Sequence, residues 1–217
     1  MQHNPVAYFF AHTDALGAAL FCLLLLMSLA SWFCIAAKAF RLWRIARDGT
    51  RFRREFWRSP RPACEPDNPF SRLAEASIAV HRDVHDKRSD GDELLLRCMQ
   101  RVVGEEGARL DNGQTLLASI AAVAPFVGLF GTVWGVQHAL SAIGTAGAAS
   151  LEQIAGPVGE ALIMTALGLA VAIPAVLAYN MFSRSSQTLL ARLDGFAHEL
   201  HHYLITGQML PVTARGV

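Results

Sequence analysis

Glu160 is the side chain best suited to proton chemistry, because it stands directly before a run of 23 residues, 161–183, without Asp, Glu, Lys or Arg. Ser150 and Gln153 have the spacing of a helix-capping box, which predicts a helix beginning near Leu151. Glu160 would then lie about 14 Å from the start of that helix. A charged carboxylate in hydrocarbon costs about 2.5–3.5 kcal/mol, so we expect it to face water, a partner or an interior and to exchange a proton. If the helix begins only at Pro157, the carboxylate lies instead at the membrane interface.

Two threonines are further polar candidates, Thr132 in the uncharged run 112–151 and Thr165 in the run 161–183. A hydroxyl in a membrane helix can donate to the carbonyl four residues earlier, in which case it has no functional role, or it can join a line of water molecules along a pore. The sequence leaves both alternatives open, and a straight helix separates Glu160 from Thr165 by about 140°. His138 lies near the outer end of its run and is expected at the interface.

Three uncharged runs, 15–37, 112–151 and 161–183, are each long enough to cross a bilayer, which takes about 20 mostly apolar residues. The first run is no typical signal peptide, because residues 1–14 contain no Lys or Arg and the apolar stretch is long. We therefore predict an all-α integral membrane protein with a retained first anchor. The predicted transmembrane helices are 15–37, 114–143 and 151–183.

The basic residues sort sharply along the chain and predict its orientation. Sixteen of the 19 lie between Lys38 and Arg109, and the other three follow the last span. The positive-inside rule puts 38–111 and the C-terminal helix and tail 184–217 in the cytoplasm, with residues 1–14 and the loop 144–150 in the periplasm. The formal net charge of +1 offers no field for nucleic acid, and a hydrophobic content of 53% is too high for disorder.

The cytoplasmic region reads as helical extensions joined by a proline-rich linker at 59–69, with no enzyme motif. Lys38, Arg41, Arg44 and Arg47 recur every three residues and predict that the first helix continues with a basic face. This face suits anionic lipid headgroups or is an ordinary positive-inside anchor. His81 and its neighbour at i+4 lack a metal-binding context, so no metal, cofactor or catalytic residue is predicted.

Small residues form stripes on the second and third spans, which predicts that these two helices pack closely. On the second span they recur every three or four residues and include Gly128, Gly131 and Gly135; on the third they include Gly168 and Ala172. Such spacing keeps them on one face and lets two backbones approach. For these positions we expect a packing role rather than a chemical one.

The segments APFVGLFGTVWGVQHAL (124–140) and GPVGEALIMTALGLAVAIPAVLAYN (156–180) resemble the ExbB/TolQ family of bacterial proton-channel subunits. The resemblance implies a ring-like, pentameric homo-oligomer in the inner membrane, whose second and third spans surround the single helices of an ExbD-type or TolR-type partner. It also implies that Thr132, Glu160 and Thr165 line the pore, with the small residues packing around it. The tail DGFAHELHHYL (194–204) looks closer to the ExbB branch.

The function implied by this resemblance is a proton-channel and stator subunit that drives TonB-dependent uptake across the outer membrane. A TolQ-type subunit of the Tol-Pal envelope system is the first alternative. In a second, the carboxylate and threonines only hold subunits together, as a passive scaffold for a partner that handles all protons. A solute transporter working alone is disfavoured by three spans without an internal repeat.

Overall fold

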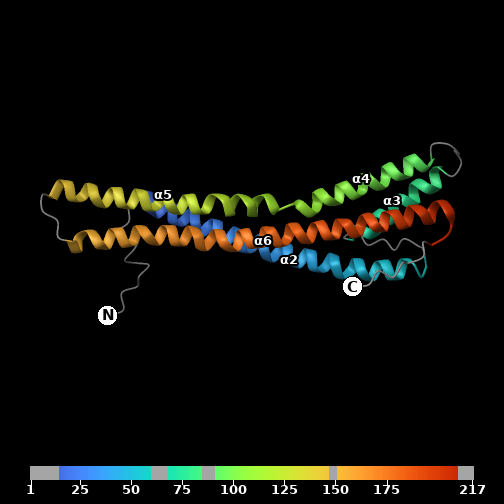
Figure 1. The fold of residues 1–217 in the computed structure, drawn as a ribbon, viewed down its shortest axis with the longest axis horizontal. Helices are drawn as coiled ribbons and strands as arrows, with labels where there is room; N and C mark the ends of the chain where they lie inside the picture. The colour runs from blue at the N-terminus through green and yellow to red at the C-terminus, as the bar shows by residue number, and fades with distance from the viewer. Residues whose placement is uncertain (1–14, 60–67, 85–90, 147–150, 210–217) are drawn as a thin grey trace. The chain divides into compact units, whose positions relative to one another are not determined.

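The structure is a computed structural model that describes residues 15–59, 68–84, 91–146 and 151–209. The secondary structure in these ranges consists of five long helices, coloured in chain order in Figure 1. They are α2 (Ala15–Phe56), α3 (Pro69–Val84), α4 (Gly91–Asp111), α5 (Gln114–Ala146) and α6 (Leu151–Thr206). The loop expected at 144–150 is shorter at its start, because residues 144–146 continue α5; residues 147–150 lie outside the described ranges.

Two compact units make up the chain, and α2 and α6 each contribute to both. The described part of unit 1 is 15–37, 113–146 and 151–181, and that of unit 2 is 38–59, 68–84, 91–112 and 182–209. Among the described residues, three helical stretches are long and apolar enough to cross a membrane, as the uncharged runs predict. They are Ala15–Phe56, which is α2; Gly91–Ser141, which covers α4 and most of α5; and Val158–Thr206, which lies in α6.

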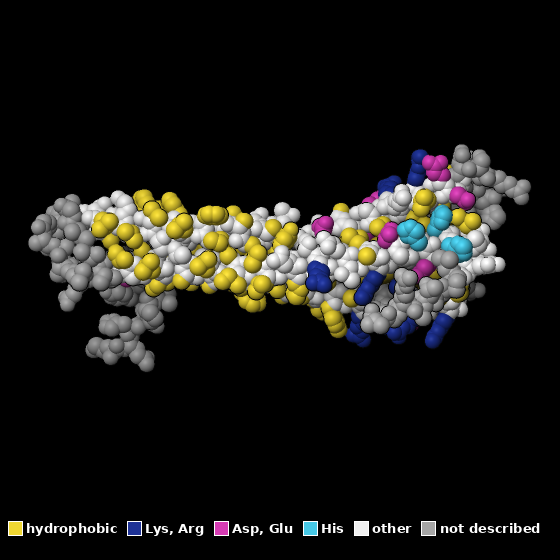
Figure 2. Space-filling model, in the orientation of Figure 1, with side chains coloured by type: hydrophobic (Ala, Val, Ile, Leu, Met, Phe, Trp, Pro, Cys, Tyr) yellow, Lys and Arg dark blue, Asp and Glu magenta, His cyan; other side chains and the backbone are white. Residues whose placement is uncertain are grey.

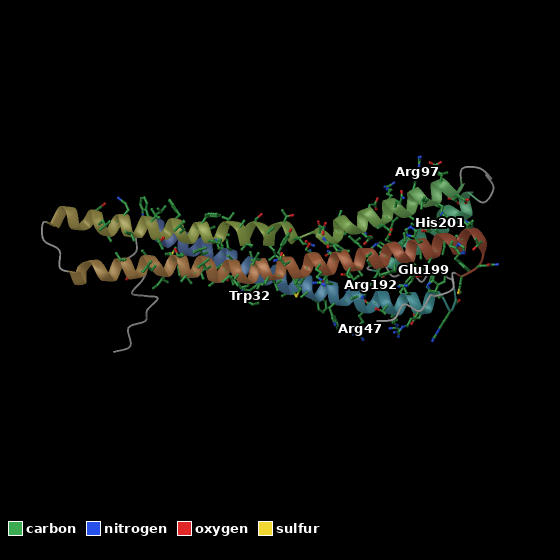
Figure 3. The ribbon with its side chains drawn as sticks, viewed as in Figure 1. Trp32, Arg47, Arg97, Arg192, Glu199 and His201 are labelled. Atoms are coloured by element: carbon green, nitrogen blue, oxygen red, sulfur yellow. The ribbon has the colours of Figure 1, made fainter. Side chains whose placement is uncertain are left out.

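Unit 1 exposes large apolar side chains that water would not tolerate as a continuous surface. Examples are Trp32 and Phe33 on α2, of which Phe33 is 77% exposed, and Phe126 on α5. Figure 2 shows hydrophobic side chains spread over the visible face of this unit, and Figure 3 marks Trp32 among them. This exposure suits a unit whose solvent is lipid, where apolar surface carries no penalty.

Unit 2 has an ordinary hydrophobic core with aromatic residues at its centre. Phe196 of α6 is fully buried and packs edge-on against Phe52 and Phe56 of α2 and Phe70 of α3, with ring centroids 5.5–6.3 Å apart. Leu73, Leu95 and Met99 fill the space around them. The charged side chains on the visible face of the molecule gather on this unit (Figure 2).

Helix ends in unit 2 follow from local chemistry. The Asn68 side chain accepts a hydrogen bond from the Phe70 backbone N–H at 3.0 Å, and Pro69 takes the first position of α3, where a missing N–H costs nothing. The last residue of the predicted linker 59–69, Pro69, therefore belongs to α3, and residues 60–67 lie outside the described ranges. Gly207 closes α6 with a positive φ of 69°, which glycine adopts without strain.

Lys38 departs from the expected basic face. Only 8% of it is exposed, and its ammonium donates to the backbone carbonyls of Leu110 at 2.7 Å and Asn112 at 2.9 Å. Carbonyls at a helix C-terminus lack intrahelical partners and carry partial negative charge, so a buried ammonium suits the end of α4. A period of three drifts around a helix of 3.6 residues per turn, which explains why Lys38 lies inside while Arg41 and Arg44 are exposed.

Candidate functional site

Helices α5 and α6 run antiparallel and side by side in unit 1 (Figure 1), and two glycines lie where their backbones are close. A Cβ added to Gly128 would lie 2.7 Å from the Met164 carbonyl oxygen and 3.0 Å from the Gly168 Cα. A Cβ on Gly168 would lie 2.7 Å from the Ala124 carbonyl oxygen. Because the obstructing atoms are backbone, no side-chain movement can relieve these contacts. The two glycines are therefore required by the distance between the helices.

Two further glycines of the predicted stripe continue this contact toward the C-terminal end of α5 and the N-terminal end of α6. Gly131 faces the Met164 side chain, and a Cβ on Gly135 would lie 3.0 Å from the Cβ of Ala161. Ala172, farther along α6, is buried. The structure therefore brings Gly128, Gly131, Gly135 and Gly168 into the α5–α6 contact.

Thr132 and Thr165 meet across this contact. The Thr165 hydroxyl donates to the Thr132 hydroxyl oxygen at 3.3 Å, and the Thr132 hydroxyl donates to the Leu129 carbonyl at 2.7 Å. Thr132 is 8% exposed. The sequence left open whether each hydroxyl bonds to its own helix or to another group, and Thr132 does both. It donates to the carbonyl three residues earlier on α5, and its oxygen accepts a hydrogen bond from Thr165 on α6. A hydroxyl can rotate, so the same atoms could bond to water instead.

Glu160 lies on α6 one residue before Ala161, which packs against Gly135. Helix α6 begins at Leu151 and continues through Pro157, so Glu160 is about 14 Å from its start at the usual helical rise. The side chain is half-buried and has no hydrogen-bond or ion-pair partner within the described part of the chain. Neither threonine contacts it through a hydrogen bond, in agreement with the angle expected between positions 160 and 165. A half-buried carboxylate of this kind can accept hydrogen bonds from water.

Two polar residues near Thr132, Gln137 and Ser141, are not among the candidates predicted from the sequence. Thr132, Gln137 and Ser141 share the lining of a cavity of about 640 Å³, whose other walls are apolar and include Leu162 of α6. The Gln137 amide donates to the Ser141 hydroxyl at 3.0 Å. Their position on the same predicted span as Thr132 could have indicated them. Exposed polar residues near a helix end are common, however, so this position alone does not distinguish a functional residue. His138, the predicted interfacial residue, is exposed on α5.

The sequence predicts no metal site, and the structure can be searched for metal ligands only in its described ranges. Within the described ranges no three His, Cys, Asp or Glu side chains are grouped as metal ligands. His81 lies on α3, whereas its i+4 neighbour is outside those ranges. The polar side chains described above in unit 1 comprise three hydroxyls, one amide and one carboxyl, all of which can form hydrogen bonds with water: Thr132, Thr165, Ser141, Gln137 and Glu160.

Comparison with known proteins covers most of the chain. Residues 65–195 match the sequence model of the MotA/TolQ/ExbB proton channel family. The biopolymer transport protein ExbB of Xanthomonas campestris is 42% identical over 206 residues, covering 85% of this chain and 79% of the relative. ExbB of Neisseria meningitidis is 40% identical over 212 residues, covering 90% and 95%. The Tol-Pal system protein TolQ of Haemophilus influenzae is 33% identical over 181 residues, covering 74% and 76%.

Proposed function

Because this chain belongs to the MotA/TolQ/ExbB proton channel family, we propose that it is the proton-channel and stator subunit of a TonB–ExbB–ExbD-type complex. The complex uses the proton motive force to drive TonB-dependent uptake across the outer membrane. The ExbB relatives support this branch because they are more similar to the chain, over more of its length, than the TolQ relative of Haemophilus. The observation that carries the proposal is the threonine pair between α5 and α6, together with the Glu160 carboxylate on α6, which has no partner among the described residues.

In this mechanism Glu160 binds and releases a proton, and the threonines carry hydrogen bonds along the water path. Unpaired within the described chain, the carboxylate has its oxygens free for water or for the partner. Rotation of the Thr165 and Thr132 hydroxyls would exchange their mutual hydrogen bond for bonds to water. Each charge that crosses 100 mV releases about 2.3 kcal/mol, so several protons could drive a costly conformational step. This is channel chemistry, and we propose no enzymatic activity.

The assembly we propose is a pentamer in the inner membrane, in which α5 and α6 of each chain surround the single-span helices of an ExbD-type partner. The apolar side chains that unit 1 leaves exposed support it, because they need lipid or neighbouring subunits as cover. We further propose a periplasmic N-terminus and a cytoplasmic unit 2, in accordance with the distribution of Lys and Arg.

The partner that co-purifies tests the branch. We expect the tagged full-length protein, solubilised from its own membranes, to bring with it an ExbD-type protein and TonB, identified by mass spectrometry. Deleting the chain should then stop growth on an iron–siderophore complex while leaving the outer membrane intact. Co-purification of a TolR-type protein, together with envelope leakage on deletion, would contradict the ExbB assignment and favour a TolQ-type subunit.

Replacing Thr165 with Val separates a role in the proton path from a passive scaffold. The change removes the hydroxyl but keeps the branched shape, and an interhelical hydrogen bond in a membrane contributes only about 0.6 kcal/mol. We therefore expect an intact oligomer with siderophore uptake reduced several-fold. Thr165→Ser, which restores the hydroxyl, should recover most of the uptake. Loss of the oligomer in proportion to the loss of uptake would instead support the scaffold.

A further inference from the structure

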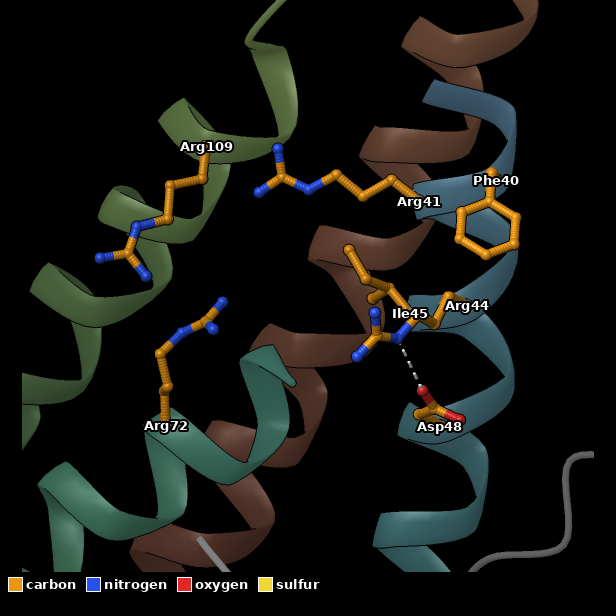
Figure 4. Close-up of a pocket in the computed structure, with 7 residues that line it drawn as sticks. All are labelled: Phe40, Arg41, Arg44, Ile45, Asp48, Arg72 and Arg109. Carbon is orange, nitrogen blue, oxygen red and sulfur yellow. Dashed lines mark ion pairs between the residues drawn. The ribbon is translucent and has the colours of Figure 1, made fainter. Parts of the chain in front are cut away.

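A basic cavity of about 560 Å³ lies within unit 2, formed by α2, α3 and α4 (Figure 4). Its lining consists of Phe40, Arg41, Arg44, Ile45, Asp48, Arg72 and Arg109. Figure 4 shows the guanidinium groups of Arg41, Arg44 and Arg72 directed into the space between α2 and the other two helices. Four arginines on three helices thus surround one volume, and the channel function described above uses none of them.

Three of these arginines form ion pairs with two acidic residues, Asp48 and Glu106. Glu106, 3% exposed, accepts from Arg72 Nε at 2.8 Å and from Arg109 at 3.0 Å, so one carboxylate serves two guanidinium groups. Asp48 faces Arg44 at 3.8 Å, at the limit of an ion pair. Arg41 has no ion-pair partner among the described residues. Among the residues that line the cavity, four arginines are present with one acidic residue, Asp48.

Guanidinium groups in this arrangement favour one kind of ligand. The planar fork of Arg matches the oxygens of a phosphate and donates two parallel hydrogen bonds to it. Lining residues Phe40 and Ile45 add an apolar wall, which suits a ligand with a hydrocarbon portion. Arg41 follows the end of the uncharged run 15–37 by four residues, about 6 Å along a helix. That distance corresponds to the headgroup layer beyond the hydrocarbon core.

We propose that this cavity binds a phosphate group, supplied either by the headgroup of an anionic phospholipid or by a soluble phosphate ester. Arg41 and Arg44 contact the phosphate oxygens. Arg72 and Arg109, held by Glu106, add positive charge from α3 and α4. A bound phosphate would tie α2 to the α3–α4 pair and so stabilise unit 2 next to the membrane.

The test uses the full-length protein in its purified oligomeric form, delipidated in a neutral detergent. Phosphatidylglycerol is titrated and followed by native mass spectrometry, with phosphatidylcholine as the zwitterionic comparison; inorganic phosphate and glycerol 3-phosphate are added in separate thermal-stability titrations. The double variant Arg41→Gln/Arg44→Gln removes two cavity arginines. Its matched control, Arg47→Gln/Arg54→Gln, removes two arginines of α2 that are exposed and do not line the cavity.

We expect saturable binding of phosphatidylglycerol that weakens about tenfold or more in the cavity variant, as for the loss of charge-assisted hydrogen bonds, and less than twofold in the control. If millimolar phosphate or glycerol 3-phosphate stabilises the wild type and not the cavity variant while the lipid has no effect, the phosphate comes from a soluble ester. If neither probe distinguishes the cavity variant from the wild type, there is no such site. Equal weakening by both double variants would also overturn the proposal, since it indicates attraction to the general surface charge.

Discussion

Replacement of Glu160 by Gln is expected to reduce TonB-dependent siderophore uptake to about a hundredth of the wild-type rate or less, the lower range for removing a positioned proton-transfer group. Glutamine has almost the same size and keeps the hydrogen-bonding capacity, but it cannot bind and release a proton in the working pH range. Because Glu160 has no partner within the described chain, the substitution breaks no internal ion pair. We therefore expect the oligomer to form and to retain its membrane partner.

Three measurements make this expectation decisive: uptake of labelled siderophore, oligomer mass in detergent, and recovery of the partner. Glu152→Gln is the matched control, because it removes the same charge from the same helix eight residues earlier; it should leave uptake unchanged. Glu160→Asp keeps the titrating group on a shorter side chain and should recover part of the activity. Normal uptake by Glu160→Gln would contradict the assigned role, and loss of the oligomer would support a scaffold.

Substitution of Gly128 by Val is expected to have the largest structural effect in unit 1. Even the Cβ alone would lie 2.7 Å from the Met164 carbonyl oxygen and 3.0 Å from the Gly168 Cα, so α5 and α6 must separate. Overpacking of this kind costs about 1–3 kcal/mol or more, and separation also lengthens the Thr165–Thr132 hydrogen bond. We expect a lower apparent melting temperature, less monodisperse oligomer and loss of uptake, measured by thermal unfolding in detergent and by size-exclusion chromatography.

Gly195→Ala provides the control for glycine replacement as such. Gly195 lies on α6 in unit 2, and a Cβ there meets nothing within 4 Å. Alanine is favoured over glycine in a helix by about 1 kcal/mol, so this variant should be unchanged or slightly more stable. If Gly128→Val unfolded at the same temperature as the wild type, the close α5–α6 approach would not hold in the assembled protein.

Much of the fold could be predicted because its signals are local in the chain. The three uncharged runs predict helices long enough to cross a membrane, and the structure has such helices. The glycines at 128, 131, 135 and 168 predict a close helix contact because a fixed helical period puts them on one face. Two of these runs contain the threonines, and Glu160 stands directly before the third run, so the sequence indicates the helices on which the candidate residues lie but not their partners.

The sequence by itself determined which segments are helical, which of them suit lipid, and which polar residues occur within those segments, because charge and spacing act along one chain. Only the tertiary structure decided how each side chain is used. It turned Lys38 inward to the carbonyls of α4, paired Thr165 with Thr132, and gathered arginines from three helices around one cavity. The physical reason is that helical periodicity fixes the faces of a single helix but not its rotation against its neighbours, and hydrogen bonds between helices depend on that rotation to within an ångström.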